Sequence, residues 1–181
     1  KADPDRIAHW TETLSELPGL KVGVLWTSLV LDASRYQYFS PFEQWAPVLR
    51  TPGVSFVNLQ YGDQSEAIAN ARSAFGVELH QPDGIDLKND LDEVAALCCA
   101  MDLVVGVSNA TFNIAAACGA PCWLIGIKSA WPRLGSDRYP WYSQVRAFAP
   151  ERHGAWDGVM TQVAGALALE ATRGTPRSAR G

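Results

Sequence analysis

The sequence predicts an α/β fold in which a doubly wound, mainly parallel sheet of about six strands carries helices on both faces. The first observation behind this prediction is a series of short apolar runs without polar alternation, as in strands that are covered on both sides. The second is that segments with helical spacing of apolar residues separate these runs. Strands that alternate with helices imply crossover connections, which place the strands parallel in one sheet.

The elements can be placed along the chain from their apolar patterns and boundaries. The runs predicted as strands are residues 22–26, 55–59, a weaker 77–79, 103–107, 122–127 and 145–148. The predicted helices are residues 5–17, 42–49, 63–75, 90–100, a segment from Asn109 or Thr111 to Gly119, and 156–171. Pro and Gly end several of these helices, as is common at helix termini. The irregular stretches 27–41 and 129–143 follow strands, so we expect them to form walls of a ligand site.

Length, composition and charge bound the class of protein. The 181 residues, 48% of them hydrophobic, suit a single domain over residues 1–172 with a flexible tail at 173–181. A net charge of −4 and scattered basic residues argue against a nucleic-acid partner. No apolar run is long enough for a membrane span, and the residues from Lys1 onward do not have the pattern of a secretory signal, so we expect none. The first residue is Lys1 rather than Met, so we expect a piece of a longer protein whose N-terminal half is absent.

Common catalytic and metal-binding motifs are missing. The four cysteines have apolar neighbours and no metal-site spacing, so we expect reduced thiols in a cytoplasmic protein that needs no metal and no cofactor. GxGxxG, GxxxxGK[ST], GxSxG and HExxH are absent from the sequence. Their absence argues against a classical dinucleotide fold, a P-loop nucleotidase, a serine hydrolase with a nucleophile elbow and a zinc protease.

The best candidate for a site is the polar turn from Ser108 to Thr111, which joins a predicted buried strand to a helix of small residues. Such a junction presents unpaired helix amides and the positive end of the helix dipole. A phosphate or another anion binds well there. Every parallel α/β protein has several such junctions, so the rest of the chain decides what this one means.

Several motifs in order give the chain a family resemblance. They read VGVLW, FVNLQYGDQSE, DGIDLKNDLDEVAAL, MDLVVGVSNATFNIAAACGAPCWLI and WPRLGSDRYPWYSQVRAF. From roughly Lys21 to Leu167 the chain resembles the C-terminal, donor-binding half of heptosyltransferase-like (ADP-heptose:LPS) glycosyltransferases. Within this family, the chain resembles the subgroup whose domains follow tetratricopeptide repeats in large bacterial proteins. The resemblance implies a GT-B fold of two facing Rossmann-like halves, of which this chain is the half that holds the nucleotide sugar.

The resemblance also implies which residues bind the donor diphosphate. The family's turn usually reads Asp-Thr-x-x-x-His, and here Ser108 stands for the Asp, Asn109 for the Thr and Asn113 for the His. The implied diphosphate ligands are therefore Ser108, Asn109, Ala110, Thr111 and Asn113, with side chains and amides that can donate hydrogen bonds. Arg35, in the loop after the first strand, is implied as a phosphate clamp, and the alternative is an ordinary surface arginine.

Four further residues are implied as contacts to the nucleoside or the sugar. Gln60 ends the second strand, and Asp86 and Asn89 lie in the loop after the third. The alternative for Gln60 is a helix cap. Trp131 lies in a Pro-containing loop, where an aromatic ring can stack on a sugar or a base or can serve only in packing. For Trp141 we expect packing.

The function implied is the nucleotide-sugar-binding domain of a glycosyltransferase that transfers a sugar from a nucleoside-diphosphate donor to an acceptor hydroxyl. Its partners would be the nucleotide sugar and an N-terminal domain of the same longer chain, such as tetratricopeptide repeats. The acceptor and the usual catalytic base come mainly from that other half in the family. We therefore assign no catalytic residue and expect no transfer by the isolated domain. Two alternatives stay open: a non-catalytic interaction or scaffold module, and half of a nucleotide-sugar epimerase.

Overall fold

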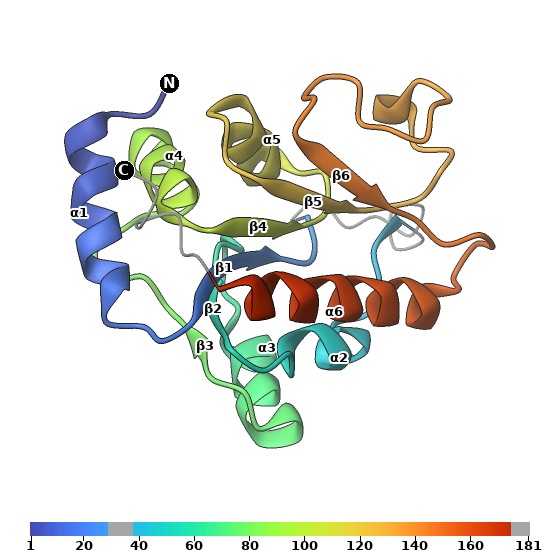
Figure 1. The fold of residues 1–181 in the computed structure, drawn as a ribbon, viewed down its shortest axis with the longest axis horizontal. Helices are drawn as coiled ribbons and strands as arrows, with labels where there is room; N and C mark the ends of the chain where they lie inside the picture. The colour runs from blue at the N-terminus through green and yellow to red at the C-terminus, as the bar shows by residue number, and fades with distance from the viewer. Residues whose placement is uncertain (29–37, 175–181) are drawn as a thin grey trace.

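The computed structural model describes residues 1–28 and 38–174, which form a six-stranded sheet with flanking helices. Every strand pair is parallel, in the spatial order β3-β2-β1-β4-β5-β6 (Figure 1). The strands are β1 (Leu20–Leu25), β2 (Val54–Asn58), β3 (Leu79–His80), β4 (Leu103–Gly106), β5 (Cys122–Ile125) and β6 (Val145–Phe148). The predicted α/β class with a doubly wound parallel sheet is confirmed. The winding reverses between β1 and β4, and ligands of such sheets bind beyond the carboxyl ends of the strands at this point.

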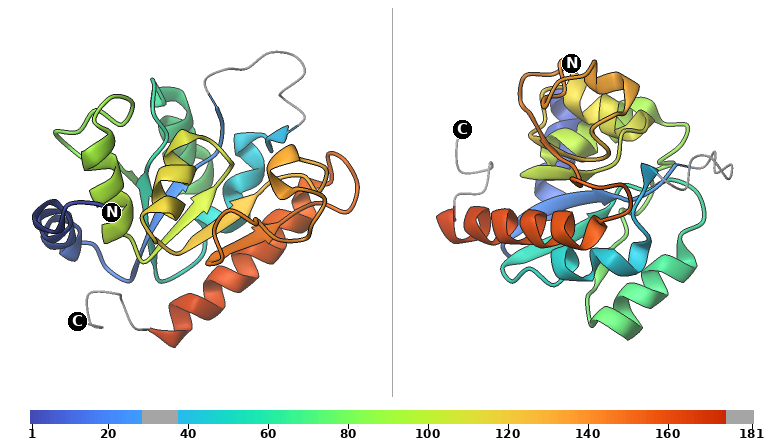
Figure 2. Two further views of the ribbon diagram at one scale, coloured as in Figure 1. Left: turned by 90° about the horizontal axis from the view of Figure 1, so that it is seen from above. Right: turned by 90° about the vertical axis from the view of Figure 1, so that its right-hand side faces the viewer.

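Helices cover both faces of the sheet, as Figures 1 and 2 show. One face carries α1 (Pro4–Ser15), α4 (Leu91–Ala100), α5 (Ala110–Ala117) and the β5–β6 connection with its short helical turn η4 (Trp131–Arg133). The other face carries η2 (Phe42–Trp45), α2 (Ala46–Leu49), α3 (Ser65–Asn70), its π-helical continuation η3 (Ala71–Phe75) and α6 (Trp156–Arg173).

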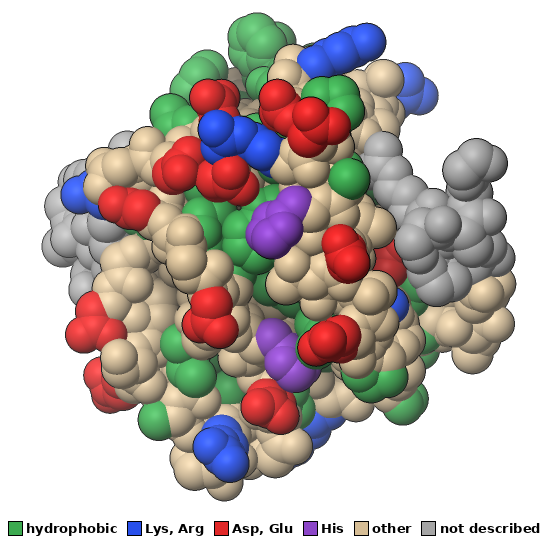
Figure 3. All heavy atoms as spheres, turned by 90° about the vertical axis from the view of Figure 1, so that its left-hand side faces the viewer, with side chains coloured by type: hydrophobic (Ala, Val, Ile, Leu, Met, Phe, Trp, Pro, Cys, Tyr) green, Lys and Arg blue, Asp and Glu red, His purple; other side chains and the backbone are tan. Residues whose placement is uncertain are grey.

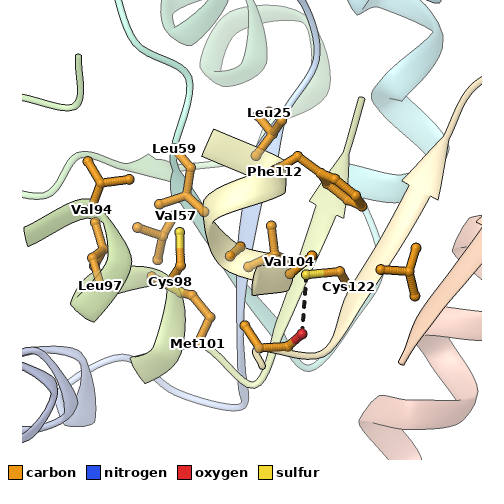
Figure 4. Packing of buried hydrophobic residues seen from close by; sticks show 14 of the residues in the cluster. Leu25, Val57, Leu59, Val94, Leu97, Cys98, Met101, Val104, Phe112 and Cys122 are labelled. Atoms are coloured by element: carbon orange, nitrogen blue, oxygen red, sulfur yellow. Dashed lines mark hydrogen bonds between the residues drawn. The ribbon is translucent and has the colours of Figure 1, made fainter. Parts of the chain in front are cut away.

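Two hydrophobic cores lie on the two sides of the sheet, because successive strand residues point to opposite faces. In β4, Val104 packs in the core under α4 and α5, whereas Leu103 and Val105 pack in the core over α6. All three are buried, so the strand reads as an unbroken apolar run rather than an alternating one. Figure 4 shows the first core, in which Leu97 and Cys98 of α4 and Phe112 of α5 pack against the sheet.

Some element boundaries differ from the predicted ones. The helix predicted from residue 63 begins at Ser65, because the Asp63 carboxylate accepts hydrogen bonds from the Ser65 amide and hydroxyl and holds the preceding turn. The weak strand predicted at 77–79 lies at Leu79–His80 and pairs only with β2. The last helix continues to Arg173, and the remainder of the predicted tail lies outside the described residues from 175 onward.

A polar contact anchors α1 on α4 at the side of the sheet opposite β6. The Asp3 carboxylate caps α1 by accepting from the Asp5 and Arg6 amides at 2.9 and 3.1 Å. The Glu93 carboxylate then pairs with Arg6 and accepts from the Trp10 indole N–H at 2.7 Å. Figure 3 shows this side of the molecule, where acidic side chains are spread over the surface and basic ones stand singly.

Of the helices in the described ranges, none has the length and apolarity needed to cross a bilayer.

Two buried cysteine thiols have raised pKa values. Cys98 and Cys122 are both fully buried in the core of Figure 4, and the Cys122 thiol donates to the Ala120 carbonyl at 3.3 Å. Burial raises the pKa of Cys98 well above its ordinary value. Burial, with a smaller contribution from Cys99, raises the pKa of Cys122 from 9.0 to about 12. Over the chain that the structure describes, no group of three His, Cys, Asp or Glu side chains is placed to hold a metal ion.

The raised cysteine pKa values predict a loss of stability in alkali. Between pH 9.0 and about 12 the unfolded chain releases the Cys122 proton while the folded chain retains it, so the free energy of unfolding falls as pH rises. The expected slope is about 1.4 kcal/mol per pH unit for each such thiol. Urea unfolding at pH 7, 9 and 10 measures it. Cys122→Ala should show a shallower slope than the parent chain, and equal slopes would contradict the prediction.

Candidate functional site

A cavity of about 510 Å³ opens at the carboxyl ends of β4 and β5, beside the point where the winding reverses. Its walls come from Ser28 after β1, Val107 and Ser108 after β4, and residues 124–127 around the end of β5. Tyr38 and Phe39 close one side, and residues 129–133 with Tyr139 close the other. Both irregular stretches that the sequence analysis singled out therefore line this cavity.

The N-terminus of α5 is fixed at the edge of this cavity by Asn109. The Asn109 side chain caps the helix by accepting from the Phe112 amide at 3.0 Å, and its Nδ2 donates to the Thr27 carbonyl at 3.1 Å. This second bond joins the carboxyl ends of β1 and β4, which are neighbouring strands. The amides of Ala110 and Thr111 are the first of the helix and have no helical carbonyl to bond. Backbone amides are therefore among the donors that this turn can offer to an anion, as the helix dipole favours.

A chain of hydrogen bonds links α5 to the β5–β6 connection. Asn113 Nδ2 donates to the Asn109 carbonyl at 2.7 Å, and Asn113 Oδ1 lies 3.0 Å from the Tyr139 hydroxyl. The Tyr139 hydroxyl lies 2.9 Å from Ser108 Oγ. Tyr139 is 3% exposed, and its ring packs edge-on against Phe112. The polar atoms of Asn113 therefore serve the turn itself.

The strongest electrostatic feature of the cavity is Arg133, which the sequence analysis missed. Arg133 is 3% exposed, and its Nε and Nη1 atoms have no hydrogen-bond partner among the described residues. It is also the one charged side chain among the described residues that line the cavity. Burying a guanidinium without a partner is costly, so Arg133 is the side chain of this cavity that is best suited to bind an acceptor or an anion. The available signal was an arginine in the wall segment 129–143, between Pro132 and Leu134.

The loop residue proposed as a phosphate clamp and the residue at the end of β2 are placed differently. Arg35 lies outside the described residues. Gln60 is fully buried, and its Oε1 accepts from the Trp26 and Thr27 amides at 3.1 and 3.0 Å. Gln60 thus holds the carboxyl end of β1 against the end of β2. It is not among the residues that line the cavity, and it does not cap the following helix.

The remaining residues implied by the resemblance are not brought together. The Asp86 carboxylate accepts from the Asn89 side chain at 2.7 Å and from the Lys88 and Asn89 amides, which lowers the pKa of Asp86. Both Asp86 and Asn89 are exposed in their own turn, outside the cavity lining. Trp131 lines the cavity with 78% of its surface exposed. Trp141 is half exposed, and its indole N–H donates to the Pro132 carbonyl at 2.7 Å, which ties the wall segment together.

The fold of this chain is shared with about one half of each of several solved glycosyltransferase structures. The ADP-heptose LPS heptosyltransferase II of E. coli superposes with a TM-score of 0.65 and 14% identity over 94% of this chain and 53% of that one. A family 9 glycosyltransferase of Veillonella parvula gives a TM-score of 0.64 and 13% identity, covering 96% of this chain and 52% of that one. E. coli heptosyltransferase WaaC gives a TM-score of 0.57 and 16% identity, covering 92% of this chain and 47% of that one. The chain therefore has the same fold as about half of each of these three glycosyltransferases.

A relative by sequence is much closer in identity. Protein FlbA of Caulobacter vibrioides is 58% identical over 166 residues, which cover 91% of this chain and 28% of that protein. No family model matches the chain. The chain thus spans less than a third of FlbA and about half of the glycosyltransferases with the same fold.

Proposed function

We propose that this chain is the nucleotide-sugar-binding domain of a glycosyltransferase that transfers a sugar from a nucleoside-diphosphate donor to an acceptor hydroxyl. The observation that carries the proposal is the buried guanidinium of Arg133, whose Nε and Nη1 have no partner among the described residues, in a cavity beside the point where the winding of the sheet reverses. A diphosphate supplies oxygens that a guanidinium can bind in pairs. No described carboxylate lines the cavity to compete for Arg133.

The amides at the start of α5 support the same ligand. Ser108 lies on the cavity wall, directly before the cap residue of α5, and this proximity supports one ligand for the helix N-terminus and Arg133. When the sugar leaves, negative charge grows on the diphosphate. Fixed amides and a guanidinium aimed at that charge favour the transition state over the bound donor. Arg133 and the Ala110 and Thr111 amides are the groups of this chain that would perform this role.

The acceptor and a general base would come from elsewhere in a longer chain, as the resemblance implies. We assign no base within the described residues. The side-chain amides of Asn109 and Asn113, the two asparagines of the turn, already donate hydrogen bonds to backbone carbonyls. That observation favours a second candidate, a domain that binds a sugar nucleotide without taking part in transfer. The two candidates differ in whether loss of Arg133 abolishes transfer by the whole protein.

Calorimetric titration of the 181-residue chain with UDP, GDP and ADP tests the proposal. We expect one of the three to bind in the micromolar to millimolar range, with an affinity that falls as salt is raised, because charge contributes to the contact. Circular dichroism and a thermal transition should confirm that the chain is folded. Flat titrations with all three nucleotides by a folded chain would reject the proposal.

A further inference from the structure

The hydroxyl groups of Ser108 and Tyr139 lie 2.9 Å apart on the cavity wall, and their distance alone does not say which one donates. The direction matters because a hydroxyl has one proton. If Ser108 gives its proton to Tyr139, it can offer only lone pairs to a ligand. If Tyr139 gives its proton to Ser108, the serine can donate to a phosphate oxygen.

The neighbouring Asn113 fixes the direction. Its side chain contacts the Asn109 backbone carbonyl at 2.7 Å, and a carbonyl only accepts. The Asn113 atom at that contact must therefore be the amide nitrogen, which removes the usual ambiguity between the two ends of an asparagine. The other end, Oδ1, then faces the Tyr139 hydroxyl at 3.0 Å.

The rest of the relay follows step by step. Asn113 Oδ1 is an acceptor, so the Tyr139 hydroxyl donates its single proton to it. In the contact with Ser108 the phenolic oxygen must then accept, and Ser108 Oγ must donate. Tyr139 cannot easily turn away, because it is 3% exposed and its ring packs against Phe112 and Tyr142 at centroid distances of 6.1 and 6.0 Å.

We propose that Ser108 Oγ is a hydrogen-bond acceptor for a hydroxyl group of the donor sugar and is not a ligand of the diphosphate. This inference rests on the proposed function. At neutral pH a phosphodiester oxygen only accepts, so it is repelled by the lone pairs of Ser108, whereas a sugar hydroxyl can donate to them. The diphosphate lies toward Arg133 and the α5 amides, and Ser108 accepts a hydrogen bond from the sugar. Tyr139 is the positioning residue that keeps Ser108 in this state.

The binding test compares each nucleoside diphosphate with its sugar nucleotide on the same 181-residue chain. The probes are UDP with UDP-glucose, GDP with GDP-mannose, and ADP with ADP-glucose. Ser108→Ala should weaken the sugar nucleotide about threefold to tenfold, the loss expected for one hydrogen bond, and should leave the diphosphate alone within about twofold. Tyr139→Phe should lower the same preference for the sugar nucleotide, while the diphosphate alone binds at least as tightly as before.

Two control variants match these changes in chemistry but lie outside the cavity lining. Ser143→Ala removes an exposed hydroxyl of the same connection, and Tyr142→Phe removes the hydroxyl of the ring that packs on Tyr139. Neither should change the ratio of the two affinities. If Ser108→Ala weakens the diphosphate and the sugar nucleotide by the same factor, Ser108 is a phosphate donor and the inference is overturned.

The proton assignment can also be tested without any ligand. The Asn113 side-chain carbonyl carbon should change its NMR chemical shift in Tyr139→Phe, which removes the donor, and should keep it in Ser108→Ala. A carbonyl shift that Tyr139→Phe leaves unchanged would overturn the relay even if the nucleotides bind. If none of the nucleotides binds while the NMR result is as expected, the relay stands and the proposed function fails.

Discussion

Replacing Arg133 with methionine is expected to stabilise the folded chain and to weaken the binding of its ligand. Methionine keeps much of the buried volume but removes a guanidinium whose Nε and Nη1 have no partner among the described residues. The free energy of unfolding without ligand should therefore rise by about 1–3 kcal/mol. The affinity for a nucleoside diphosphate should fall about thirtyfold or more, because a desolvated charge pair is lost. Urea unfolding and calorimetry measure the two effects.

The opposite signs separate a binding arginine from a structural one. A structural arginine stabilises the empty chain, so its replacement would lower the free energy of unfolding and leave the affinity of the folded chain unchanged. Arg138→Met is the matched control, because Arg138 lies in the same connection but is exposed and outside the cavity lining. It should change neither stability nor affinity by a measurable amount. A less stable Arg133→Met chain with unchanged affinity would refute the assignment of Arg133 to the site.

The positions of most strands and the two-sided core were accessible from the sequence because parallel strands that are buried on both faces read as continuous apolar runs. Residues 103–107 are the clearest case, since Leu103, Val104 and Val105 are all buried although they face two different cores. The short β3 was harder to place. It has two residues and one neighbouring strand, so few contacts fix its position.

The turn after β4 was predicted correctly as a junction between a strand and a helix, but the roles of its side chains were not accessible. A sequence shows that Asn109 and Asn113 can donate hydrogen bonds, and it does not show that both amides are already spent on the Thr27 and Asn109 carbonyls. Those partners come together only when β1 and β4 are neighbours. Whether the turn binds a diphosphate stays a prediction.

The burial of Arg133 was also not accessible from the sequence. Its hydrophobic neighbours along the chain, Trp131 and Leu134, are strongly exposed in the structure, so the apolar pattern of this segment does not show that Arg133 is the buried residue. The backbone decides this. Leu134 has a φ of 49°, which is uncommon for a residue with a side chain, and this left-handed turn ends η4 immediately after Arg133. The arginine is directed inward while its neighbours face solvent.

Gly106 is the position in the sheet where a single methyl group should do the most damage. It is paired with Leu25 across the β1–β4 boundary, and a Cβ at Gly106 would lie 2.4 Å from both the Leu25 carbonyl oxygen and Leu25 Cγ. The side chain can shift, but the carbonyl accepts the Val107 amide and is held by the sheet. Gly106→Ala must therefore separate the two strands whose ends are joined by Asn109. We expect a loss of about 3 kcal/mol or more in the free energy of unfolding.

The same substitution at Gly126 supplies the comparison. Gly126 directly follows β5 at the same edge of the sheet, and a Cβ there would meet nothing within 4 Å. Gly126→Ala should change the free energy of unfolding by less than about 0.5 kcal/mol. Urea unfolding of both variants measures the contrast. Separation of β1 from β4 also moves the cap of α5. The Gly106→Ala chain should therefore lose nucleotide binding even in the absence of urea, where it is still folded. Equal stabilities for the two alanine variants would show that β1 and β4 can move apart at little cost.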